Sequence, residues 1–244
     1  MPIYLGSNKI SLYRGSNEVS EAYLGSTLVY QNRLPYADGL VIHYDAINNT
    51  ASGHSSSARS WYDLTGNGYD AEVVLGGSDY WDSNALHVYS DSTRVRVPKE
   101  IYTSAFTVEF VIKLESLYNY GTLMRGVQSY AARDAWVGSN GVVSFRVRSS
   151  YDGATGSPLS ADTLYTVALV RNGNTQKIYI NGVLAGSYSR TVTSASNTSF
   201  DIFASTTATS RHIRGFAYSF RCYTRELSAS EILNNYNVDL ARFS

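Results

Sequence analysis

Alternation of apolar and polar residues along short segments restricts the fold of this chain more than any other feature. In residues 106–114 every even position is apolar, and the odd positions include Glu109 and Lys113. Residues 94–97 and 143–147 repeat this period of two. Successive side chains of a strand point to opposite faces. The pattern therefore predicts antiparallel strands with one buried face and one face in water.

Two Asn-Gly dipeptides mark turns between strand-like runs. Asn172-Gly173 and Asn181-Gly182 each stand between such runs. Both residue types tolerate positive φ, so each dipeptide predicts a tight hairpin. The segment before them, residues 164–170, is apolar on both faces and predicts a central strand.

One helix is predicted near the C-terminus. Ser228 suits the N-cap, and Glu231 stands where it completes a capping box. Leu227 and Ile232 flank the cap as a hydrophobic staple, and the helix is expected to end near Asn237. The residues therefore predict an all-β fold with one short C-terminal helix.

Composition limits the functions open to the chain. Its 244 residues suit one large all-β domain with an appendage, or two small domains. Charged residues make up 16% and the net charge is zero, so we expect no nucleic-acid or membrane partner. Cys222 is the single cysteine, which excludes an internal disulfide. Neither a signal peptide nor a bilayer-spanning run is visible, so we expect a soluble protein made in the cytoplasm.

Residues 1–33 contain a repeat built on Gly-Ser. Leu5-Gly6-Ser7-Asn8-Lys9-Ile10-Ser11 is echoed at 14–20 and again at 23–30. Each copy predicts a turn followed by a short strand. The repeat resembles the opening segments of bacteriophage structural proteins. Strands this short bury little alone, so we interpret 1–33 as an assembly or attachment element, with docking on the main domain (34–244) as the alternative.

A second resemblance covers about residues 39–238. Trp61-x-Asp63-Leu64-x-Gly66-Asn67-Gly68 resembles a signature of the laminin-G-like domains in the concanavalin A-like lectin and glucanase superfamily. Residues 106–113, the hairpin at 165–182 and the closing segment at 215–232 resemble further family stretches in the same order. The resemblance implies a two-sheet antiparallel jelly-roll sandwich of the type found in phage tail or fibre proteins.

The resemblance also raises a calcium site. Many relatives carry an acidic residue in the closing strand, where this chain has Tyr218. Asp63 and the carbonyls of 66–68 could supply some oxygen ligands, but calcium takes at least ~6. We therefore favour the alternative that Asp63 caps its own turn, and we predict no metal and no cofactor.

Catalysis is not expected. Glucanases of the superfamily use two glutamates close together on one strand with an aspartate between them, because one carboxyl group must protonate the leaving oxygen. Here Glu109 and Glu115 are further apart, with Lys113 between them. The four histidines are dispersed singly. We predict no catalytic residues and no enzymatic activity.

Carbohydrate binding requires less: an aromatic face against the sugar and a few polar groups on its hydroxyls. Aromatic residues beside polar ones occur at 80–82, 118–120, 133–136 and 151–153. We assign Trp61 and Trp81 to the core, since tryptophan is usually buried. The predicted ligand-binding residues are Tyr118, Tyr120, Trp136, Tyr151 and Asp152.

These observations lead to one hypothesis and one alternative. The first is a non-catalytic lectin-like module of a phage or phage-like particle that contacts bacterial surface glycan during host attachment. In it, the repeat at 1–33 contacts other virion proteins or forms a homo-oligomer such as a trimer, and the protein resides in the virion. The alternative is a structural decoration or fibre subunit that binds no glycan.

Overall fold

The computed structural model divides the chain into two compact units, Met1–Ala37 and Asp38–Ser244. In the second unit the structure describes residues 38–90, 92–99, 104–118, 120–126, 133–147, 153–190, 199–203 and 211–243. In the first unit it describes the strands given below and residues 35 and 37.

The first unit contains short antiparallel strand pairs that follow the sequence repeat. The described pairs are β1 (Tyr4–Leu5) with β2 (Asn8–Lys9), β3 (Tyr13–Arg14) with β4 (Asn17–Glu18), and β5 (Glu21–Leu24) with β6 (Thr27–Gln31). Val29 of the third repeat copy lies in β6, whereas Ile10 and Val19, at the matching positions of the first two copies, lie outside the described residues.

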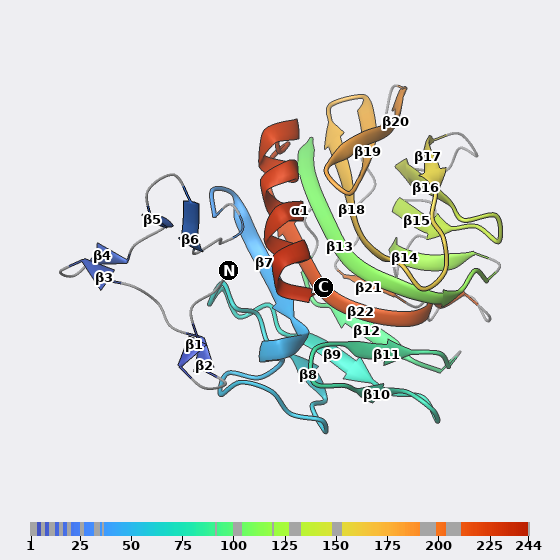
Figure 1. The fold of residues 1–244 in the computed structure, drawn as a ribbon. Coiled ribbons are helices and arrows are strands. Elements are labelled where there is room, and N and C mark those ends of the chain that lie inside the picture. Colours follow the sequence, from blue (N-terminus) through green and yellow to red (C-terminus); the bar gives the residue numbers. More distant parts are fainter. Residues whose placement is uncertain are drawn as a thin grey trace. The chain divides into compact units, whose positions relative to one another are not determined.

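The second unit is a sandwich of two antiparallel sheets, each 8-stranded in the described part of the chain (Figure 1). The helix-covered sheet has the order β10 (Tyr80–Trp81), β11 (Leu86–Val88), β22 (Arg214–Tyr223), β13 (Ala105–Ser116), β18 (Leu164–Asn172), β19 (Thr175–Ile180) and β20 (Val183–Ser189), with β7 (Leu40–Asp45) also paired to β22. The charged sheet has the order β17 (Ala154–Pro158), β16 (Val142–Val147), β15 (Arg133–Val137), β14 (Gly121–Gly126), β21 (Phe200–Ile202), β12 (Arg94–Val97), β9 (Ala71–Val74) and β8 (Ser60–Trp61). The predicted two-sheet antiparallel sandwich is confirmed.

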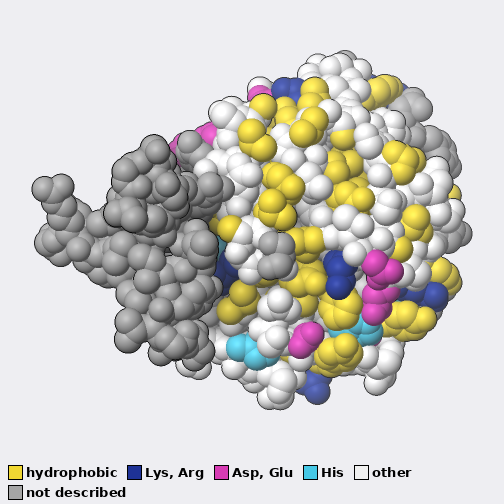
Figure 2. All heavy atoms as spheres, in the orientation of Figure 1, with side chains coloured by type: hydrophobic (Ala, Val, Ile, Leu, Met, Phe, Trp, Pro, Cys, Tyr) yellow, Lys and Arg dark blue, Asp and Glu magenta, His cyan; other side chains and the backbone are white. Residues whose placement is uncertain are grey.

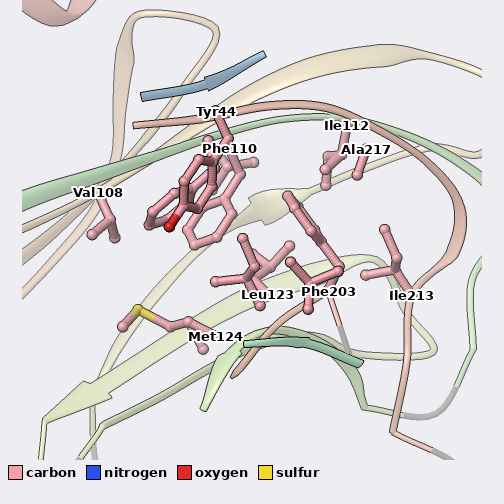
Figure 3. Packing of buried hydrophobic residues seen from close by; sticks show 14 of the residues in the cluster. Tyr44, Val108, Phe110, Ile112, Leu123, Met124, Phe203, Ile213 and Ala217 are labelled. Atoms are coloured by element: carbon pink, nitrogen blue, oxygen red, sulfur yellow. The ribbon is translucent and has the colours of Figure 1, made fainter. Parts of the chain in front are cut away.

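The main hydrophobic core lies between the two sheets. Tyr44, Phe110 and Ile112 project from the helix-covered sheet toward Leu123 and Met124 of β14 (Figure 3). Leu123 and Met124 are adjacent yet both buried, because the pairing of β14 with β15 shifts register there. Fully burying side chains of this size stabilises the fold by about 1.5–3 kcal/mol each.

The predicted turns and central strand are present. β18 pairs with β13 on one side and β19 on the other. Asn181 and Gly182, between β19 and β20, have φ of 52° and 79°, and Gly173 has φ of 55°. Gly173 and the pair Asn181-Gly182 therefore mark the two hairpins because their backbone enters the left-handed region, whereas Asn172 is the last residue of β18.

The described part of the chain has two helical elements: a short 3-10 turn, η1 (Ala46–Asn48), and the C-terminal helix α1 (Ala229–Phe243). The capping box is confirmed: Glu231 accepts from the Ser228 N–H at 2.7 Å, and the Ser228 hydroxyl accepts from the Glu231 N–H at 3.3 Å. The predicted end near Asn237 is wrong, because Val238 and Phe243 are buried against the sheet and extend the helix. Within the described residues, no helix is long and apolar enough to span a membrane.

Helix α1 lies over the outer face of β13, β18 and β22 (Figure 1). The sequence pattern predicts that this face of β13 is in water, and that prediction is wrong. Glu109 is 1% exposed and Val111 is completely buried. The period of two identified the strand correctly, but it contains no information about a helix from a distant segment covering the polar face.

Candidate functional site

Oppositely charged residues alternate across the outer face of the charged sheet. In the strand pairing, Asp201 lies opposite Arg96 on one side and Arg125 on the other. Asp134 in turn lies opposite Arg125 and Arg146. We call these five residues the charged row. They project outward because their strand neighbours, including Val95 and Phe145, point into the core.

Ion pairs hold the charged row in place. Arg96 Nε lies 2.9 Å from Asp201 Oδ1, and Arg146 Nη2 lies 2.9 Å from Asp134 Oδ2. Arg125 Nη1 is 3.5 Å from the same Asp134 oxygen. Asp134 is only 2% exposed, and this burial raises the pKa of its carboxyl group, while Arg125 and Arg146 act in the opposite direction. Opposite charges across neighbouring strands stabilise a sheet.

Two aromatic rings stand beside the end of the charged row. Trp136 lies on the same face of β15 as Asp134, and its ring is 4.9 Å from the Arg146 guanidinium carbon. Tyr120, which begins the turn into β14, places its ring 6.1 Å from that of Trp136. Tyr120 is 43% exposed and has a φ of 58°. Arg211 covers the Tyr120 ring at 4.9 Å.

These side chains enclose two neighbouring hollows, which together we call the divided groove. The smaller, of about 200 Å³, is lined by Tyr120, Asp134, Trp136, Arg146 and Arg211. The larger, of about 260 Å³, is lined by Trp136, Ser144, Phe145, Arg146, Gly153, Ala154, Thr155 and Tyr188. Trp136 and Arg146 line both hollows, so their stacked pair forms the wall between them.

Close backbone approach shapes the far end of the divided groove. A Cβ atom on Gly153 would lie 2.3 Å from the Phe145 carbonyl oxygen. A Cβ on Gly186 of β20 would lie 1.9 Å from the Thr155 carbonyl oxygen. Glycine at both positions lets β16, β17 and β20 meet closely, which brings Tyr188 of β20 to the groove.

The structure places the predicted ligand-binding residues in different regions. Tyr120 and Trp136 lie together in the divided groove. Tyr118 is elsewhere, with its ring 3.7 Å from the Arg214 guanidinium carbon. Tyr151 and Asp152 lie outside the described residues, although the next residue, Gly153, lines the larger hollow.

Sequence reasoning missed most of the polar lining of the groove. Arg146, Arg211 and Tyr188 were not among the predicted residues. The alternation in 143–147 does place Arg146 on the polar face of its strand. Only the strand register, however, sets it opposite Asp134 and diagonal to Trp136.

A second aromatic cluster lies on the helix-covered sheet. The Tyr80 ring stacks on His87 at 4.7 Å, and Tyr89 stacks on the same histidine at 6.1 Å. His87 Nε2 is 3.0 Å from Glu115 Oε2. In Figure 2, charged side chains of both signs gather beside a histidine and hydrophobic groups over β11 and β22. Nearby Trp81, by contrast, is 4% exposed, as predicted for a core residue.

Asp63 caps its own turn, as predicted. Its Oδ1 accepts from the Thr65 N–H and from the His43 N–H, each at 3.1 Å. Its Oδ2 accepts from the Tyr69 N–H at 3.3 Å, and the Thr65 hydroxyl lies 2.8 Å and 2.9 Å from the two oxygens. In the part of the chain that the structure describes, no group of three or more His, Cys, Asp and Glu side chains could hold a metal ion.

Comparison with known families identifies the fold. A laminin-G-like family model, described as the concanavalin A-like lectin/glucanases superfamily, matches residues 88–233. This chain belongs to that superfamily. The match runs from β11 into α1 and includes the strands that carry the divided groove. A search of curated protein sequences found no match.

Solved structures of the superfamily fold are similar over most of the chain. Domain 4 of AbnA, an extracellular arabinanase from Geobacillus stearothermophilus in complex with arabinotriose, is 20% identical with a TM-score of 0.62, covering 80% of this chain and 97% of that one. The botulinum neurotoxin serotype D binding domain is 17% identical with a TM-score of 0.65, covering 84% and 53%. A Trypanosoma rangeli sialidase in complex with 2,3-difluorosialic acid is 17% identical with a TM-score of 0.63, covering 81% and 32%. This chain therefore spans about half of the length of the toxin binding domain and about a third of the length of the sialidase.

Proposed function

We propose that this chain is a non-catalytic carbohydrate-binding module whose glycan contacts are made in the divided groove. The observation that carries the proposal is the convergence of Tyr120 and Trp136, two aromatic rings 6.1 Å apart, with arginine and carboxylate groups around an open hollow. Apolar ring faces suit the C–H surfaces of sugars, and placed polar groups suit their hydroxyls.

The fold supports this assignment without deciding it. Arabinotriose is present in the structure of the arabinanase domain, which this chain matches over 80% of its own length. The same fold hosts unrelated functions, so the residues of the divided groove decide what this chain can bind.

The distribution of carboxylates favours binding over cleavage. Glycoside hydrolysis uses two carboxyl groups about 5–9.5 Å apart. Among the described lining residues of the divided groove, Asp134 is the only carboxylate, and Arg146 binds it. Glu109 instead pairs with Arg221 beneath α1, and Glu115 pairs with His87.

Substitution of the two rings tests the groove. The full chain is screened on an array of bacterial surface glycans, and the best ligand is then titrated by calorimetry. Trp136→Ala and Tyr120→Ala are each expected to weaken binding roughly 10-fold or more, since buried aromatic anchors dominate such contacts. Tyr80→Ala is the matched control, because Tyr80 is 47% exposed and lies on the other sheet. No binding at high protein concentration, or equal losses in all three variants, would contradict the proposal.

We further propose that the module acts in host attachment by a phage or phage-like particle, a setting supported by the N-terminal repeat alone. Light scattering on the full chain and on a chain starting at Asp38 tests this. A trimer or larger for the full chain and a monomer for the shorter one are expected, because weak glycan sites gain from avidity. If both are monomers, the repeat is not an oligomerisation element.

Unchanged host attachment in Trp136→Ala would favour the alternative of a structural decoration or fibre subunit.

A further inference from the structure

Arg211 is the charged residue of the divided groove that the charged row does not use. Its guanidinium carbon lies 4.9 Å from the centre of the Tyr120 ring, and it lines the smaller hollow with Asp134 and Trp136. Among the described residues, Arg211 forms no ion pair. A cation–π contact orients a guanidinium group but leaves its N–H donors available for a ligand.

Positive charge exceeds negative charge around the smaller hollow. Asp134 is flanked by Arg125 at 3.5 Å and by Arg146 at 2.9 Å, so its negative charge is already matched within the charged row. Asp201, the other carboxylate of the row, pairs with Arg96. Arg211 also acts electrostatically on Asp134, so three arginines share this one carboxylate and the hollow keeps a net positive charge.

Arg146 offers a second set of donors to the same hollow. The contact with Asp134 uses its Nη2, at 2.9 Å, while its guanidinium carbon lies over the Trp136 ring, 4.9 Å from the ring centre. The cation–π contact and the ion pair together hold the guanidinium group in place, so little conformational entropy is lost when its remaining N–H groups bind. Arg146 also lines both hollows, so a ligand that fills both hollows must contact it.

We propose, on the basis of the proposed function, that the divided groove selects glycans with carboxylate-bearing sugars, such as uronic acids. Arg211 and Arg146 receive the carboxylate, and the rings of Tyr120 and Trp136 contact the sugar ring. A planar guanidinium fork matches a planar carboxylate with two parallel hydrogen bonds. Neutral glycans would bring no negative group to Arg211 and Arg146.

A matched pair of probes tests this selectivity. The full chain is titrated with an oligogalacturonate and with the same oligosaccharide after complete methyl esterification, which removes the charge but keeps the sugar. A glycerol phosphate oligomer serves as the third probe, since phosphate also suits arginine. We expect the carboxylate form to bind about 10-fold more tightly than the ester, a difference that shrinks in high salt. Arg211→Gln is expected to remove most of this difference, and Arg211→Lys to restore part of it.

The control and the outcomes separate this inference from the proposed function. Arg59→Gln removes an exposed arginine outside the lining of the groove and is expected to change nothing. If the carboxylate and ester forms bind equally through Trp136, or if Arg211→Gln and Arg59→Gln behave alike, charge selectivity is overturned while the carbohydrate-binding proposal stands. Tighter binding of the phosphate oligomer also overturns the carboxylate assignment. Failure of every glycan, neutral or charged, to bind overturns both proposals.

Discussion

The two sheets each carry a charged outer face, but they use it differently. Beneath α1, Arg221 Nε lies 2.9 Å from Glu109 Oε2, and Arg221 also forms two hydrogen bonds with Asp239. These three side chains are at most 2% exposed. On the charged sheet the carboxylates are equally buried, yet Arg96 and Arg146 keep 25% and 23% of their side-chain surface.

The difference lies in what covers each face. Helix α1 supplies Asp239 and Asn235 and closes a network in which Asn235 donates to Glu109 at 2.9 Å. A network closed in this way can hold the helix to the sheet but cannot meet a ligand. The charged row is partly open, and Trp136 and Tyr120 stand beside its exposed end. Arginine–carboxylate pairs therefore hold the structure together under the helix, whereas on the other sheet similar pairs are available for binding.

The largest expected effect tests that contrast with one substitution in each region. Arg221→Met should lower the free energy of unfolding by about 3–5 kcal/mol, because it leaves two carboxylates in a buried site without their cation. Arg146→Met should cost only about 1 kcal/mol, since Asp134 keeps Arg125 beside it and Arg146 is partly in water. Urea unfolding of both variants without ligand measures the difference. Equal losses would mean that cover by α1 does not distinguish the two regions.

A smaller effect should appear in the pH dependence of stability. Burial raises the pKa of Glu109 to about 7, although Arg221 and the hydrogen bond from Asn235 oppose the shift. Burial also raises the pKa of Asp239, so one arginine serves two buried carboxylates. The second oxygen of Glu109, Oε1, is buried with no hydrogen-bond partner among the described residues, which further disfavours the charged form.

The sign of this effect follows from the raised pKa. Between pH 4.5 and about 7 the folded chain holds a proton on Glu109 that the unfolded chain releases. The contribution of Glu109 to stability is therefore largest below pH 4.5 and falls as the pH rises through 7. In Glu109→Gln, the loss of unfolding free energy between pH 5 and pH 8 should be smaller by about 1–3 kcal/mol. Urea unfolding at a series of pH values measures this difference. Glu72→Gln on the charged sheet is the exposed control, and an unaltered slope in Glu109→Gln would contradict the assignment.

The sequence predicts elements well and their partners poorly. Alternation identified β12, β13 and β16, and the Ser228–Glu231 box identified the start of α1, because these signals are local. The burial of Glu109 and the extension of α1 to Phe243 depend on contacts between segments distant in the sequence. The candidate site follows the same rule. Trp136 could be chosen from its polar neighbours, but the contribution of Arg146 depends on strand register, and that of Arg211 on a contact with Tyr120, a residue far away in the sequence.

The smallest effect concerns the cap that begins α1. Ser228→Ala removes the hydroxyl that accepts from the Glu231 N–H, and should cost about 1 kcal/mol. Glu231 also binds Arg225 at 2.7 Å, so the first turn keeps one tether, and only its amides should exchange faster with solvent. Ser78→Ala, which changes an exposed serine in the turn before β10, is the control and should leave stability nearly unchanged. If Ser228→Ala also loosened the amides around Asp239, the cap and the buried charges would form one cooperative unit. Helix α1 would then open as one unit from its first turn to Asp239. The contrast with the open charged row would depend on the whole of α1 and not only on the residues around Asp239.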